Sequence, residues 1–159
     1  MIDSPEKRID KNAITAWRTT GILFGLLWYS IPVIPIIAHI NKDAPIWIVI
    51  LSVIVAITLH IVVGYVFPVV RWKRWKYEVT EKGVDMLHGI IIRKRTMVPV
   101  NRIQHVDTKQ GPIYRKFGLS ALSISTAATT HEIPALDDET ASELRTLISE
   151  LVRQAREDV

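Results

Sequence analysis

The sequence contains 159 residues, of which 48% are hydrophobic and 23% are charged, and its formal net charge is +4 at pH 7. This composition excludes an intrinsically disordered chain and a collagen-like repeat. The absence of cysteine excludes a disulfide scaffold, a thiolate nucleophile, cysteine-bound zinc and an iron–sulfur cluster. The charged residues are concentrated in parts of the chain, which argues against a purely soluble protein.

Two long segments, residues 21–40 and 44–70, contain no Asp, Glu, Lys or Arg. At about 1.5 Å per helical residue, the first segment spans roughly 30 Å, which is the thickness of the hydrocarbon layer of a bilayer. Backbone groups find no hydrogen-bond partner in lipid, so both segments are expected to be helical. The short linker between them predicts an antiparallel transmembrane hairpin, with kinks at Pro32 and Pro35 in its first helix.

A cleavable signal peptide and a buried hairpin in a soluble protein are the alternatives for these segments. A signal peptide has a shorter apolar core followed by a small-x-small cleavage site, and the sequence has neither feature. A buried hairpin would need more covering residues than the remaining part of the chain supplies.

The lysine and arginine residues around the two segments predict the orientation of the hairpin. Cations stand before the first segment and after the second, whereas the linker has only Lys42. The positive-inside rule then places both termini in the cytoplasm of a plasma-membrane protein. We therefore expect a cytoplasmic segment over residues 1–20, the hairpin over residues 21–70, and a cytoplasmic domain over residues 71–159.

The cytoplasmic domain has the pattern of several short strands followed by one helix. Period-two alternation predicts strands around Tyr77–Thr80, Val84–His88, Ile92–Val100, Ile103–Thr108, Leu122–Ser125 and Thr130–Ile133. In this pattern Ser120, Ser123 and Ser125 are expected to face solvent. Strands do not alternate with helices, so a bent antiparallel sheet or a small barrel is expected rather than a parallel sheet.

A C-terminal amphipathic helix is the clearest element of this domain. Its apolar stripe contains Leu144, Leu147, Ile148, Leu151, Val152 and Ala155. Asp137 or Asp138 is expected to cap its first turn. The preferred interpretation is that the stripe covers the sheet of its own domain, and a partner helix is the alternative.

Three segments of the domain follow recognisable patterns. Tyr77–Gly83 fits Y-x-(L/V)-T-x-x-G, Val98–Val106 fits V-P-x-x-R-I-Q-x-V, and Gln110–Leu119 fits Q-G-P-x-x-R-x-F-G-L. In their order and spacing these segments resemble motifs of bacterial pleckstrin-homology-like (PH-like) domain membrane proteins of the YdbS-like family. The resemblance implies a seven-stranded PH-like barrel capped by the C-terminal helix, at the cytoplasmic face. The motif residues singled out are Arg102, Ile103, Gln104, Gly111, Pro112, Phe117 and Gly118.

Two cationic clusters are candidates for contact with the membrane surface. The first comprises Arg71, Trp72, Lys73, Arg74, Trp75 and Lys76, and the second comprises Arg93, Lys94 and Arg95. Tryptophan and cations can also bind single-stranded nucleic acid. Because the first cluster directly follows a predicted membrane helix, we interpret it as a headgroup anchor and expect no nucleic-acid partner. The second cluster is either a lipid contact or a solvated strand face.

Catalysis and metal binding have little support in the sequence. The five histidines form no HExxH or His-x-His pair, no serine lies in G-x-S-x-G, and no phosphate-binding glycine loop is present. We therefore expect no catalytic residue, no metal and no cofactor. His60 is the exception to consider, because it lies inside the second apolar segment. It is either a polar functional group within the membrane or a neutral histidine hydrogen-bonded to a neighbouring helix.

The sequence thus favours a non-enzymatic binding role. The leading hypothesis is an assembly or scaffold subunit that pairs with a related PH-like membrane protein, with further copies of itself, or with both. A small oligomeric transport subunit and an anionic-lipid-binding module are the alternatives, and a lipid enzyme is the least favoured.

Overall fold

The computed structural model describes residues 5–157, which divide into two compact units. One unit consists of residues 14–69 and contains the apolar segments. The other consists of residues 5–13 together with residues 70–157, and we call it the sheet module. Residues 5–13, which the sequence analysis assigned to a leading segment of residues 1–20, are thus part of the sheet module.

The apolar segments form two candidate membrane-spanning helices, Asn12–Ile40 and Ile46–Arg74, each 29 residues long. The first consists of α1 (Asn12–Gly25), a 3₁₀ segment η1 (Leu26–Ser30) and α2 (Val33–Ile40). The second consists of α3 (Ile46–Ile61), a π-helical turn η2 (Val62–Val66) and α4 (Phe67–Arg74). Both helices extend beyond the segments expected from the sequence.

Proline explains where these helices depart from regular α geometry. The 3₁₀ segment ends just before Pro32, which precedes the first residue of α2. Pro35 lies in the first turn of α2, where backbone N–H groups have no intrahelical partner, so it removes no hydrogen bond. The π turn overlaps the residues whose carbonyl groups would otherwise accept from the missing N–H of Pro68.

Small residues allow the two apolar helices to approach each other closely. A Cβ atom added to Gly21 would lie 2.8 Å from the carbonyl oxygen of Val63, and one added to Gly25 would lie 2.9 Å from Nδ1 of His60. Gly21 and Gly25 form a G-x-x-x-G motif, the spacing that brings small residues onto one helix face. This face of the first helix therefore packs against the second helix of the same hairpin.

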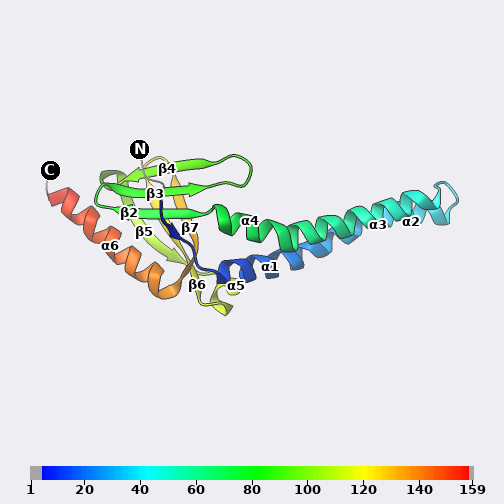
Figure 1. The fold of residues 1–159 in the computed structure, drawn as a ribbon, viewed down its shortest axis with the longest axis horizontal. Helices are drawn as coiled ribbons and strands as arrows, with labels where there is room; N and C mark the ends of the chain where they lie inside the picture. The colour runs from blue at the N-terminus through cyan, green and yellow to red at the C-terminus, as the bar shows by residue number, and fades with distance from the viewer. Residues whose placement is uncertain (1–4, 158–159) are drawn as a thin grey trace. The chain divides into compact units, whose positions relative to one another are not determined.

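The sheet module contains two antiparallel sheets (Figure 1). The first has the order β1-β2-β3-β4, and the second has the order β5-β6-β7. Their bounds are β1 (Lys7–Arg8), β2 (Lys76–Thr80), β3 (Gly83–His88), β4 (Lys94–Pro99), β5 (Ile103–Lys109), β6 (Leu119–Thr126) and β7 (Thr130–Asp137), with the 3₁₀ turn η3 (Val100–Arg102) and the short helix α5 (Pro112–Lys116) between strands.

The antiparallel sheets expected from the sequence are present, but closure of the expected barrel is not shown, because the described strands form two separate sheets with no ladder joining them. Pro99 ends β4 and has no N–H to donate, and η3 then turns the chain before β5 begins. The register of β5 against β6 also shifts between Ile103 and His105. These features separate β4 from β5 at one side of the module.

The C-terminal helix α6 (Asp138–Glu157) packs on β5, β6, β7 and η3, which confirms that it covers the sheet of its own domain. Asp137 accepts hydrogen bonds from the backbone N–H groups of Glu139 (3.1 Å) and Thr140 (3.5 Å), as a capping residue does. Leu144 and Ile148 are buried, but Leu147 of the predicted stripe is 44% exposed.

The predicted exposure of the serines on β6 is wrong for Ser120 and Ser123, which are both buried. β6 is the middle strand of its sheet and is also covered by α5 and α6, so alternation does not distinguish an outer face. Ser120 is satisfied there by donating its hydroxyl to Asp138 at 2.6 Å. The largest fully buried side chains of the module include Met86, Leu119, Leu122, Ile124, Ile133, Leu136 and Ile148.

Candidate functional site

The first cationic cluster, residues 71–76, divides into packed and exposed side chains. Trp72 donates its indole N–H to the carbonyl oxygen of Ile9 at 3.1 Å, and Trp75 is buried at 7% exposure. Lys73 and Arg74 are exposed. The two tryptophans therefore serve the packing of the module, and Lys73 and Arg74 are the cations of this cluster most available to lipid headgroups.

Trp75 packs against the end of the β3–β4 hairpin that carries its loop. Its ring stacks on His88 with 4.9 Å between centroids and 15° between planes. Burial lowers the pKa of His88, and the positive charges of Lys94 and Arg71 lower it further. The neutral form of His88 is therefore favoured. Its stacking on Trp75 brings this residue of the first cationic cluster beside the hairpin that carries the second cluster.

The second cluster also divides, because Arg95 is engaged within the sheet. Its guanidinium contacts the carboxylate of Asp85 through Nε at 2.9 Å and Nη2 at 2.5 Å. This hydrogen bonding raises the pKa of Arg95. Arg93 and Lys94 are exposed, and neither forms an ion pair with another residue in the range 5–157. They remain the predicted lipid contacts of this hairpin.

Ile92 lies outside β4, although alternation had predicted it as a strand residue. Residues 89–93 form the loop between β3 and β4, and Ile91 and Ile92 lie in it with exposed side chains. Alternation of apolar residues did not identify this loop as a candidate surface. The signal was the run Ile90-Ile91-Ile92 between a glycine and three cations.

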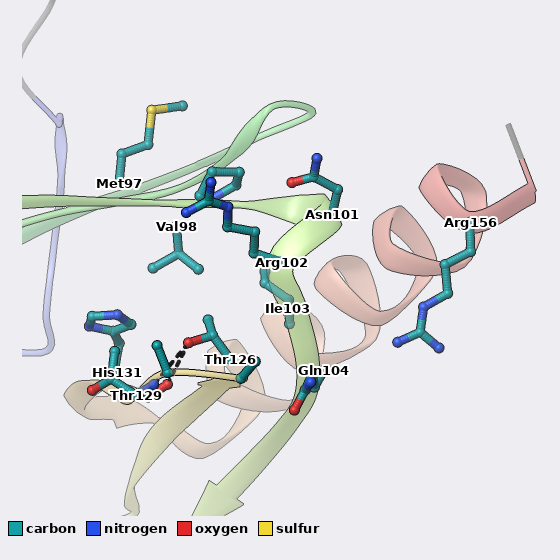
Figure 2. Close-up of a pocket in the computed structure, with 13 residues that line it drawn as sticks. Met97, Val98, Asn101, Arg102, Ile103, Gln104, Thr126, Thr129, His131 and Arg156 are labelled. Atoms are coloured by element: carbon teal, nitrogen blue, oxygen red, sulfur yellow. Dashed lines mark hydrogen bonds between the residues drawn. The ribbon is translucent and has the colours of Figure 1, made fainter. Parts of the chain in front are cut away.

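The motif residues Arg102, Ile103 and Gln104 line a pocket of about 670 Å³ at the separation between the two sheets. The other walls come from the end of β4, the β6–β7 turn, His131 and Arg156. No carboxylate lines the described part of this pocket. Figure 2 shows Arg102 and Arg156 on either side of β5 in that view, rather than converging on one point.

The remaining motif residues form a structural turn. Pro112 begins α5, and Gly118 has φ of +63°, a left-handed conformation that closes the turn before β6. Gln110, which precedes this turn in the chain, donates its side-chain amide N–H groups to the carbonyl oxygen of Leu119 at 3.0 Å and to the carboxylate of Asp138 at 2.9 Å. This segment ties the start of β6 to the start of α6.

His60 packs within the apolar hairpin. Its ring lies 5.5 Å from that of Tyr29, and its Nδ1 atom is buried without a hydrogen-bond partner. This leaves Nε2 as the ring atom through which a hydrogen bond to a neighbouring helix could form. Both interpretations of His60, a polar functional group and a hydrogen-bonded neutral histidine, stay predictions.

The described residues show no constellation for catalysis. Within residues 5–157, no group of three His, Asp or Glu side chains lies close enough to hold a metal ion. Ser120 and Ser123 are buried, and the one described side-chain partner of Ser120 is a carboxylate rather than a histidine base. The surfaces that remain are the pocket, the free strand edges and the cationic hairpin.

Comparison with known families agrees with this architecture. The family model described as "Bacterial PH domain" matches residues 15–152. The chain belongs to the bacterial PH domain family. It is 38% identical over 161 aligned residues to UPF0699 transmembrane protein YdbS of Bacillus subtilis (strain 168), and the match covers the whole of both chains.

A second relative of this bacterial PH domain protein is much longer. UPF0699 transmembrane protein YdbT of the same organism is 24% identical over 94 residues, which cover 57% of this chain and 19% of YdbT. No solved structure matches the chain. The two apolar helices and the similarity to a transmembrane protein support a membrane location, and none of the matched names states an enzymatic activity.

Proposed function

We propose that this bacterial PH domain protein is a membrane-anchored assembly subunit that presents its sheet module at the cytoplasmic face. The module binds a related PH domain membrane protein, a second copy of itself, or both. The observation that supports this role is the separation between the sheets, where the pocket opens beside two strand edges. Such an edge binds an extended partner segment by adding it as a strand.

Two features of the module suit it to this role. β4 and β5 each pair on one side only in the described sheets. The family-motif residues Arg102 and Gln104 lie at this separation, so recognition of a partner would use side chains that also mark the family. Confinement to one membrane surface would raise the effective concentration of such a partner.

The pairing of β1 with β2 supports a shared side for the two ends of the hairpin. Lys7 lies opposite Tyr77, and Arg8 lies opposite Lys76, on strands that precede the first span and follow the second. Strands can pair only in one compartment. The positive-inside rule then favours the cytoplasm for both.

Site-specific photo-crosslinking in native membranes tests the assembly role. A benzophenone amino acid at Asn101, which is exposed at the pocket, should crosslink to a coexpressed longer relative or to a second copy. The same group at Glu143, on the exposed face of α6, is the matched control. Absence of any protein adduct at position 101, or equal adducts at both positions, would contradict the proposal.

A further inference from the structure

The loop between β3 and β4 presents apolar side chains to solvent. A Cβ atom added to Gly89, which has φ of +115°, would lie 1.9 Å from the carbonyl oxygen of Ile92. Only glycine allows this close approach. The tight bend leaves Ile91 at 94% exposure and Ile92 at 82% exposure.

These exposures are unusual within the sheet module. The other large apolar side chains that are exposed among its described residues are Met97 at 53% and Leu147 at 44%. Two adjacent isoleucines at a hairpin tip form too small a patch for a stable protein interface, which buries about 800 Å² on each partner. Their exposure suits insertion into a soft apolar phase better than docking on a rigid surface.

Cations surround this tip. Arg93 and Lys94 follow the isoleucines and are exposed, and no Asp or Glu occurs between Met86 and Val106. The charges of Lys94 and Arg71 both act on His88 at the base of the loop. The positive field thus extends from the loop to the last turn of the second candidate span, which also contains Lys73 and Arg74.

The base of the loop is held beside the residues that follow this span. Trp75 is the first residue after α4, and it stacks on His88, the last residue of β3. The base of the loop is therefore tied to the residue at which the chain leaves the span. This connection through the chain is what relates the loop to a bilayer that holds the span.

We propose that Ile91 and Ile92 insert into the interfacial region of the same bilayer that holds the apolar hairpin, with Arg93 and Lys94 at anionic headgroups. Apolar side chains flanked by cations have the chemistry of this region. Insertion adds a second membrane attachment and fixes the orientation of the sheet module on the surface. This inference requires the membrane location but does not depend on the assembly role.

Fluorescent labelling of single cysteines tests the insertion directly, because the chain has no cysteine of its own. Ile91→Cys and the control Glu143→Cys, on the exposed face of α6 and outside the pocket, are labelled with an environment-sensitive dye. The full chain is then reconstituted in vesicles of phosphatidylcholine and phosphatidylglycerol. We expect blue-shifted emission at position 91, with several-fold stronger quenching by bromine-labelled lipid than at position 143.

Two further measurements separate lipid from protein contact. Arg93→Gln with Lys94→Gln should reduce the quenching at position 91 in these vesicles, and less so in phosphatidylcholine alone. Equal emission and quenching at positions 91 and 143 would overturn the proposal. A blue shift at position 91 that rises with the protein-to-lipid ratio and is insensitive to brominated lipid would show a protein contact, and would also overturn it.

Discussion

Replacement of Arg95 by methionine should destabilise the sheet module, because it leaves the Asp85 carboxylate without its partner. The side chain of Asp85 is 13% exposed and that of Arg95 is 36% exposed. The loss therefore comes from the carboxylate, since a buried polar group left without its hydrogen bonds costs about 1–3 kcal/mol.

A double-mutant cycle isolates the pair itself. Asp85→Asn, Arg95→Met and the combined variant are unfolded with urea in detergent micelles, with tryptophan fluorescence as the signal. We expect a coupling energy of about 1–2 kcal/mol, since the double variant no longer buries an unpaired charge. Lys94→Met is the matched control on the same strand, because Lys94 is exposed and forms no described ion pair.

The outcome that would refute this reasoning is a coupling energy below about 0.5 kcal/mol, the range of independent sites. Arg95 would then be as available to headgroups as Arg93. A Lys94→Met variant as unstable as Arg95→Met would show instead that the loss comes from general charge removal on β4.

Three further predictions concern packing and titration. Ile148→Ala should lower the free energy of unfolding in urea by about 2–5 kcal/mol, because Ile148 is fully buried. Leu147→Ala should lower it by less than about 1 kcal/mol, because Leu147 is 44% exposed, and equal losses in the two variants would contradict the packing of α6. Gly21→Leu should destabilise the apolar hairpin by about 1–3 kcal/mol in detergent, because its Cβ would meet the backbone of Val63, whereas Leu23→Ala, at an exposed position, should have little effect. Burial and the charges of Lys94 and Arg71 lower the pKa of His88 in the folded chain, so the unfolded chain binds the proton first as the pH falls. Stability should therefore decline as the pH falls through the ordinary histidine pKa of about 6.5, and this decline should be smaller in His88→Phe.

Most of the secondary structure could be predicted from local patterns. The turn at Gly89, the helical turn closed by Gly118 and the cap at Asp137 each depend on neighbouring residues alone, and all three are present. The C-terminal helix also follows from its periodicity. The periodicity alone does not say whether the apolar stripe of this helix packs on its own sheet or on a partner helix. Packing on its own sheet was preferred because that is the more common arrangement.

Features that depend on distant residues could not be predicted in this way. The burial of Ser123 requires knowing that β6 is covered on both faces, and the separation of the sheets depends on how Pro99 and η3 place β5. The pairing of Lys7 with Tyr77 joins residues separated by the whole apolar hairpin. The motif residues could be identified by resemblance, but their common position at one pocket required the fold.

The isoleucine loop shows a different difficulty. Ile92 fits the alternating pattern of the following strand, so the pattern assigned it to that strand. Its exposure results from Gly89 and from the register that pairs His88 with Lys94. A one-residue change in register would have moved the strand's side chains to the opposite face.

The pairing of β1 with β2 also constrains how the protein is made. The ribosome releases β1 before either apolar helix exists, and β2 emerges only after both have been synthesised. β1 therefore has no β2 to pair with until both apolar helices have been inserted into the bilayer. A chain that inserted only one helix would leave β1 and β2 on opposite sides of the membrane, with the apolar side chain of Ile9 uncovered. The pairing of β1 with β2 can therefore form only in a chain that has inserted both helices.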